Sequence, residues 1–166
     1  MPPMIKLRRL LLPTDFSESA RHALTYAISF AREHAAELTL LHVVEVLPAH
    51  YAGELYPAAM SQFVEEVSGY ARATLAKLAE EARAHGVTVS ERLATGKAAE
   101  EVIRVARQEQ TDLIVIGTHG GGALSHVLFG STTERVVRKA PCPVLICRLS
   151  EHEFVTDEPE GQPPRT

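Results

Sequence analysis

The chain has 166 residues, with 17 Lys and Arg against 21 Asp and Glu, which gives a formal net charge of −4 at pH 7. Its 45% hydrophobic and 23% charged residues are typical of a folded globular protein and argue against disorder. The acidic balance argues against a nucleic-acid partner. Two Cys indicate a reducing compartment, and no apolar run approaches the roughly 20 residues of a membrane span. We therefore predict a cytoplasmic protein without nucleic-acid or membrane partners.

Short apolar strands alternate with helices along the chain. The first helix begins at a Ser17 cap, and the 47–59 segment, with two Pro, a Gly and two Tyr, is predicted to be a loop. Such alternation predicts one α/β domain over residues 1–150, an open parallel sheet with helices on both faces. Residues 151–166, with five acids and three Pro, are predicted to be a disordered tail. Strands are predicted at 7–12, 38–46, 87–93, 113–116 and 144–147, and further helices at about 60–85, 98–108 and 131–139.

A glycine-rich loop follows the strand at 113–116. Sheets of this kind bind ligands at the carboxyl ends of their strands, where the winding reverses. Glycines allow a backbone to approach an anion closely, and the helix that begins near Gly130 offers free N–H groups and hydroxyls to a phosphate. The glycine spacing fits neither a Walker A loop nor a dinucleotide-binding turn. An alternative without a ligand is a capping box formed by Ser131 and Glu134.

The spacing Gly117-x2-Gly120-x9-Gly130-Ser131 resembles the signature of the universal stress protein family, in its ATP-binding branch. The stretches LLLPTDFSESARHAL, LTLLHVVEV and GSTTERVVRKAPCPVLIC are similar to further parts of that family, so the resemblance covers about residues 7–148. It implies a single-domain, Rossmann-like, five-stranded parallel sheet of order 3-2-1-4-5. ATP would lie across the carboxyl edge, where the first and fourth strands are neighbours.

The resemblance also implies a role for each position of the site. Asp15 would accept hydrogen bonds from the ribose hydroxyls; the alternative is that Asp15 only caps a turn or the first helix. The Val43 backbone would contact adenine, and Mg2+ would arrive with the nucleotide, held by phosphates and water. His and Cys spacing predicts no metal site formed by the protein. Pro13 and Thr14 would form the turn beside the nucleotide, Gly117 and Gly120 would frame the ribose and phosphates, Gly130, Ser131, Thr132 and Thr133 would bind phosphate oxygens, and His119 fits the pattern without an assigned role.

The resemblance implies an ATP-dependent regulatory switch of the stress response. Rapid hydrolysis needs positioned water and neutralised charge, and residues 117–133 contain neither Lys nor Arg, so we expect at most slow hydrolysis and no catalytic residue. A true ATPase, an AMP or cyclic AMP sensor and a nucleotide-free interaction module are the alternatives. The apolar edge Val144–Cys147, through which such family members commonly pair, predicts a homodimer. Cys142 and Cys147 would point to opposite faces of a strand, so no disulfide is expected.

Overall fold

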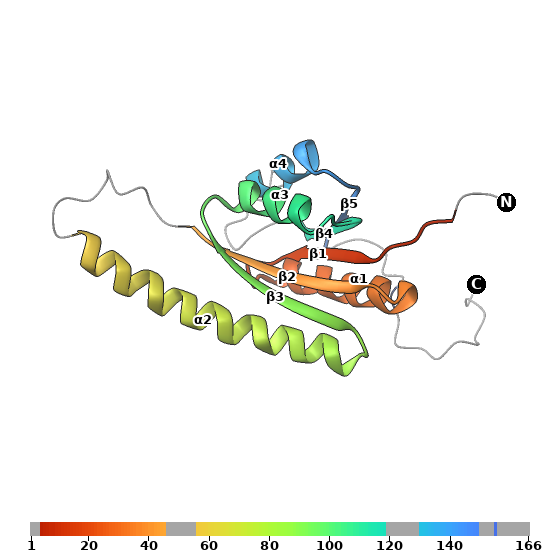
Figure 1. The fold of residues 1–166 in the computed structure, drawn as a ribbon, viewed down its shortest axis with the longest axis horizontal. Helices are drawn as coiled ribbons and strands as arrows, with labels where there is room; N and C mark the ends of the chain where they lie inside the picture. Colours follow the sequence, from red (N-terminus) through yellow and green to blue (C-terminus); the bar gives the residue numbers. More distant parts are fainter. Residues whose placement is uncertain (1–3, 46–55, 119–129, 150–154, 156–166) are drawn as a thin grey trace.

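The computed structural model describes residues 4–45, 56–118, 130–149 and 155. Strands and helices alternate along the whole described chain, as the sequence predicts (Figure 1). The elements are β1 (Arg9–Pro13), α1 (Glu18–His34), β2 (Glu37–Val44), α2 (Tyr56–Ala84), β3 (Thr88–Thr95), α3 (Ala98–Gln108), β4 (Leu113–Gly117), α4 (Ser131–Lys139) and β5 (Val144–Cys147).

The five strands form one parallel sheet in the order β3-β2-β1-β4-β5, which confirms the predicted order. β1 lies at the centre, with Leu10 paired to Leu38 of β2 and to Leu113 of β4. The chain winds outward from β1 in one direction through β2 and β3, and in the other through β4 and β5. The carboxyl ends of β1 and β4 therefore lie side by side at the point where the winding reverses.

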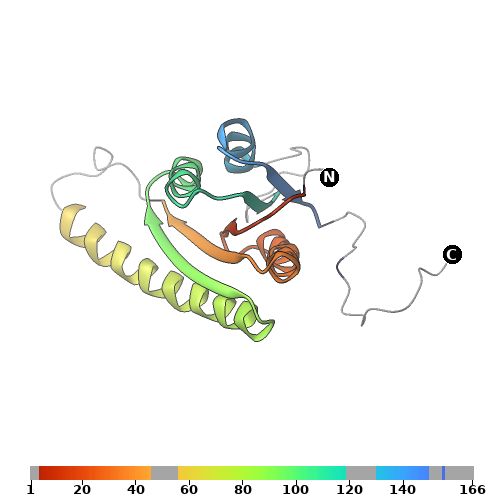
Figure 2. The ribbon, with the colours of Figure 1, turned by 45° about the vertical axis from the view of Figure 1, so that its right-hand side comes forward.

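Helices cover both faces of the sheet. α1 and α2 lie on one face, and α3 and α4 lie on the other (Figure 2). Within β1, Leu10 and Leu12 pack toward α1 and α2, while Leu11 packs toward α3 and α4. This double burial explains why the central strands read as unbroken apolar runs rather than alternating ones. Each fully buried Leu contributes about 1.5–3 kcal/mol relative to an exposed one.

The largest boundary error of the sequence prediction concerns α2. The helix begins at Tyr56, inside the segment predicted as a loop, because Pro57 falls in its first turn, where a proline costs no intrahelical hydrogen bond. The rest of that predicted loop, residues 47–55, lies outside the described residues. At its other end α2 is followed by Gly86 with φ +81°, the left-handed glycine expected there. The β3 strand continues two residues beyond the predicted end, to Thr95.

Other predicted features fall partly within the described residues. Cys142 is half-buried and Cys147 is buried, and the two form no disulfide with each other, as predicted. Burial raises the pKa of the Cys142 thiol. Of the predicted tail, Val155 is described, and it packs against the core on the α1 and α2 side. Among the described helices, none combines the length and hydrophobicity needed to cross a membrane.

Candidate functional site

The chain leaves β1 through a tight turn that side chains hold in place. Thr14 is buried, and its amide donates to the Leu41 carbonyl of β2 at 2.8 Å. The Thr14 hydroxyl accepts from the Phe16 amide at 3.1 Å, and Asp15 Oδ1 accepts from the Ser17 amide at 3.0 Å. Phe16 has φ +66°, a left-handed conformation that a non-glycine residue adopts only when its surroundings enforce it. The turn thus has a defined shape at the carboxyl edge of the sheet.

Asp15 stands exposed at this turn. One of its carboxylate oxygens holds the turn, and the other has no partner within the described residues. Ser17 caps α1, as predicted, by accepting from the Ala20 amide at 3.3 Å. Asp15 therefore caps its own turn and still offers an acceptor toward solvent. The capping interpretation and the ribose interpretation are compatible.

Gly117 ends β4 at a point where the start of α1 lies directly against the strand. A Cβ on Gly117 would contact the Ser19 hydroxyl and would lie 2.7 Å from the Ser19 carbonyl carbon and oxygen. Any larger residue would push α1 away from the strand. The first glycine of the signature thus has a packing reason that is independent of a ligand, and it brings the start of α1 against the end of β4.

The two residues that flank the 119–129 segment lie together. The Gly130 amide donates to the Thr118 carbonyl at 2.9 Å, so the two flanks of the 119–129 segment are bonded directly. His119 and Gly120, two predicted site residues, lie outside the described residues. Because of this bond, α4 begins beside the carboxyl end of β4. The neighbouring strand is β1, and Asp15 lies just after its carboxyl end.

The N-terminus of α4 differs from the predicted capping box. Gly130 is the N-cap residue, with φ −65° and ψ 155°, Ser131 is already the first helical residue, and no side chain of the described residues caps the helix. The Glu134 carboxylate instead pairs with Arg138 at 2.9 Å, one turn further along. The capping-box prediction is therefore wrong, because the helix frame begins one residue earlier than it requires.

Three backbone amides at this helix end are open. The first intrahelical bond runs from the Glu134 amide to the Gly130 carbonyl, so the amides of Ser131, Thr132 and Thr133 have no acceptor among the described residues. The Thr133 side chain is 5% exposed, and its hydroxyl donates to the Gly117 carbonyl at 3.0 Å. Thr133 thus fastens α4 to β4. The hydroxyls of Ser131, which is exposed, and Thr132, which is half-buried, have no such bond.

The end of β2 completes this edge of the sheet. Val43 is half-buried and packs on the α3 and α4 side of the core, paired in register with Ala94, so only its main chain is open to a further role. Its neighbour His42 places Nδ1 2.8 Å from the Thr14 carbonyl and stacks on the Phe16 ring. The sequence prediction gave His42 and Phe16 no role; the available signal was a histidine inside an otherwise apolar strand.

The N-terminus of α3 lies at the same edge and is already occupied. The Ala98 amide donates to Glu45 Oε1 at 2.7 Å, and Glu100 and Glu101 fall in the first turn of the helix. A carboxylate of the protein thus takes the position in which an external anion would bind. Glu45 also received no role from the sequence.

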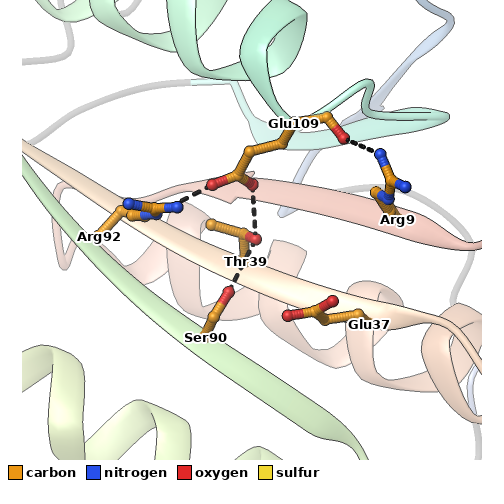
Figure 3. A pocket seen from close by; sticks show the side chains of 6 residues that line it. All are labelled: Arg9, Glu37, Thr39, Ser90, Arg92 and Glu109. Atoms are coloured by element: carbon orange, nitrogen blue, oxygen red, sulfur yellow. Dashed lines mark hydrogen bonds and ion pairs between the residues drawn. The ribbon is translucent and has the colours of Figure 1, made fainter.

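A polar hollow of about 280 Å³ lies at the opposite end of the strands (Figure 3). At its centre the Glu109 carboxylate accepts from Arg92 Nε at 2.9 Å and from the Thr39 hydroxyl at 2.8 Å. Arg9, the first residue of β1, donates to the Glu109 carbonyl at 2.6 Å. These groups satisfy one another, in contrast to the open amides of α4. The lining residues are Arg9, Glu37, Thr39, Ser90, Arg92 and Glu109.

Comparison with known proteins agrees with this arrangement. Residues 6–148 match the model of the universal stress protein family. Universal stress protein MJ0531 of Methanocaldococcus jannaschii is 34% identical over 151 residues, covering 88% of this chain and 85% of the relative. The solved universal stress protein UspA from Lactobacillus plantarum superposes with a TM-score of 0.81 at 27% identity, covering 87% of this chain and all of the other. The solved MJ0577 protein gives 0.78 at 29% identity, covering 89% and 100%. The chain belongs to the universal stress protein family.

Proposed function

We propose that this protein binds an adenine nucleotide, ATP, at the carboxyl edge between β1 and β4, and acts as a nucleotide-dependent switch in the cytoplasmic stress response. The observation that carries the proposal is the N-terminus of α4. Three amides there lack an acceptor among the described residues, and no side chain caps them. The exposed Asp15 carboxylate stands at the end of the neighbouring strand.

The donor set fits the chemistry of ATP. Amides at a helix N-terminus and the hydroxyls of Ser131 and Thr132 are donors suited to phosphate oxygens. The unpartnered oxygen of Asp15 suits a ribose hydroxyl, and the Val43 main chain suits the adenine edge. Gly130 leaves room at the helix start, because an added Cβ would meet only the Thr118 carbonyl, at 3.5 Å, among the described residues. Mg2+ would be held by the phosphates and by water.

The same residues support binding more than turnover. Residues 117–133 contain no Lys or Arg that could neutralise charge developing on a transferred phosphate. Amides, the helix dipole and Mg2+ would bear that charge, in the ground state as well as in the transition state. We therefore expect slow hydrolysis at most, which suits a switch whose bound state persists.

The ribose distinguishes ATP from cyclic AMP as the preferred ligand. Solved universal stress proteins that share this fold at 24% and 21% identity are complexes with cAMP and dAMP, respectively. Those ligands belong to those proteins, and the likeness to this chain is one of fold. In cyclic AMP the 3′ oxygen is esterified and cannot donate a hydrogen bond to Asp15. Asp15 therefore favours a nucleotide with a free ribose diol.

The edge strand β5 supports the proposal that the protein forms a homodimer, through which the nucleotide-bound state would be transmitted. Val144, Leu145 and Ile146 are half-buried on this edge, and two exposed apolar residues, Val137 of α4 and Leu149 after β5, lie nearby in the chain. An apolar edge of this kind pairs readily with a second copy. Sedimentation equilibrium should show a dimer at micromolar concentration; a monomer alone would contradict this part of the proposal.

Calorimetry on the full chain tests the ligand. We expect ATP with Mg2+ to bind more tightly than AMP or cyclic AMP, and native mass spectrometry of the freshly purified protein to find an adenine nucleotide. Absence of binding heat, of any copurified nucleotide and of a thermal shift at millimolar ATP would contradict the proposal. Those results would favour an interaction module without a nucleotide.

A further inference from the structure

His42 is a polar side chain among the apolar residues of β2. It is half-buried near the carboxyl end of β2, and its Nδ1 lies 2.8 Å from the Thr14 carbonyl oxygen. A carbonyl oxygen only accepts hydrogen bonds, so Nδ1 carries the hydrogen and donates it. This bond joins β2 to the turn that follows β1, across 28 positions of sequence.

Phe16 is held on the other side of the same imidazole. The two rings are stacked, with centroids 4.3 Å apart and planes 17° from parallel. Phe16 has φ +66°, which requires enforcement by its neighbours, and the stacked His42 ring together with the Thr14 hydroxyl supplies it. His42 therefore holds the turn at two points: it bonds the Thr14 carbonyl and stacks on the Phe16 ring.

Asp15 lies between these two fixed residues. Its Oδ1 bonds the Ser17 amide at 3.0 Å, which leaves the direction of its second oxygen determined by the turn. A turn free to relax at Phe16 would let the exposed carboxylate change its direction. Hydrogen bonds to charged groups depend steeply on such geometry.

We infer that His42 and Phe16 are positioning residues that aim the Asp15 carboxylate and thereby set the selectivity of the site for the ribose hydroxyls of its nucleotide. The inference rests on the proposed function for its ligand and on the structure alone for its geometry. It predicts coupling: removing the His42 donor disables Asp15, whereas a half-buried histidine with a merely structural role would leave ribose selectivity intact.

Two substitutions separate the donor from the volume it fills. His42→Leu fills similar space without a donor, and His42→Asn keeps an N–H donor close to the position of Nδ1. The first measurement needs no ligand: amide hydrogen exchange of Phe16 and Ser17, followed by NMR in the full chain. We expect about tenfold faster exchange in His42→Leu and near wild-type exchange in His42→Asn, because each amide reports whether its side-chain acceptor stays in place.

The second measurement is the ratio of Kd for 2′-deoxy-ATP and 3′-deoxy-ATP to Kd for ATP. We expect wild type to prefer ATP by about tenfold over at least one of them, the loss that one hydrogen bond to a charged acceptor produces. His42→Leu should reduce the preference to within about twofold, as should Asp15→Asn, while His42→Asn should retain it. The double variant should be no less selective than Asp15→Asn alone.

The outcomes distinguish the inference from the function on which it rests. Unchanged exchange in His42→Leu overturns the positioning role whatever the protein binds. Faster exchange with an unchanged ribose preference overturns the link to selectivity. If wild type binds none of the three nucleotides while exchange responds as expected, the proposed function fails, the selectivity claim fails with it, and the hydrogen-bonded turn is shown to be structural only.

Discussion

The N-termini of α3 and α4 occupy equivalent places in the fold, but a carboxylate bonds an amide at the first and no side chain of the described residues caps the second. Both helices begin at the carboxyl edge of the sheet and pack beside each other on one face (Figure 1). Glu45 places a carboxylate on the first amide of α3, whereas α4 begins at Gly130 without a side-chain cap. Both ends carry the partial positive charge of a helix dipole. We propose the anion site at the helix end that has no acid of the described residues on its amides, and the contrast between these two ends supports that proposal.

The largest expected effect comes from giving α4 the acid that α3 has. In Gly130→Asp, a carboxylate at the N-cap position would occupy the place of a phosphate, and we expect ATP affinity measured by calorimetry to fall by about 100-fold or more, or about 2.7 kcal/mol. The fold should be as stable as wild type, since Asp is a favoured cap. Gly130→Asn serves as the neutral control. Equal ATP affinity in Gly130→Asp and wild type would contradict the assignment of the phosphate site to the N-terminus of α4.

A second substitution tests the packing role of Gly117, the first of the three glycines in the signature. Gly117→Ala forces a Cβ against the backbone of Ser19, and we expect it to lower the free energy of unfolding by about 3 kcal/mol, because a backbone atom cannot move aside. Gly69→Ala in α2 is the matched control: its Cβ meets nothing within 4 Å, and the change should stabilise the helix slightly. Urea unfolding measures both. Similar values for the two variants would contradict the close approach of α1 to β4.

Substitutions at Thr133 and Thr132 test two different roles: Thr133 fastens α4 to β4, and Thr132 is proposed to contact the ligand. Thr133→Val leaves the Gly117 carbonyl without its donor, and we expect a loss of about 1–2 kcal/mol in the free energy of unfolding. Thr132→Val should leave stability unchanged and weaken ATP binding by several-fold, about 1 kcal/mol. Denaturant unfolding and calorimetry on both proteins check the pair. The reverse pattern would show that the two hydroxyls have exchanged roles.

The smallest effect is expected at α3. Glu45→Gln removes a charge but keeps an oxygen acceptor for the Ala98 amide, so we expect a loss of about 0.5 kcal/mol in the free energy of unfolding. ATP affinity should stay within about twofold of wild type. Stronger ATP binding in this variant would mean that α3 competes with α4 for the phosphates, and the comparison would lose its force.

Local pattern predicted most of the fold. Apolar runs and helical spacing predicted each strand and helix among the described residues. The errors were local ambiguities: Pro57 is compatible with a loop and with a first helical turn, and Ser131 with Glu134 fits a capping box in the wrong helical frame. Local sequence does not decide such cases, because the start of a helix also depends on contacts distant in the chain, such as the bond from the Gly130 amide to the Thr118 carbonyl.

The site was predictable in part for the same reason. Gly117 and Gly130 belong to a spaced signature that can be read along the chain, and the family resemblance adds Asp15 after the first strand. His42 and Glu45 act on Thr14 and Ala98, at separations of 28 and 53 positions, and only the folded sheet brings these groups together. Phenylalanine rarely adopts a positive φ, so nothing in the sequence indicates this conformation at Phe16.

The most direct test follows the backbone amides of both helices by NMR while ATP and Mg2+ are added to the full chain. We expect saturable shifts of the Ser131 and Thr132 amides, together with that of Asp15, and no comparable shift of the Ala98 amide, whose partner is Glu45. Unmoved Ser131 and Thr132 amides at millimolar ATP, or equal shifts at the two helix ends, would contradict the assignment of the open α4 terminus as the phosphate site.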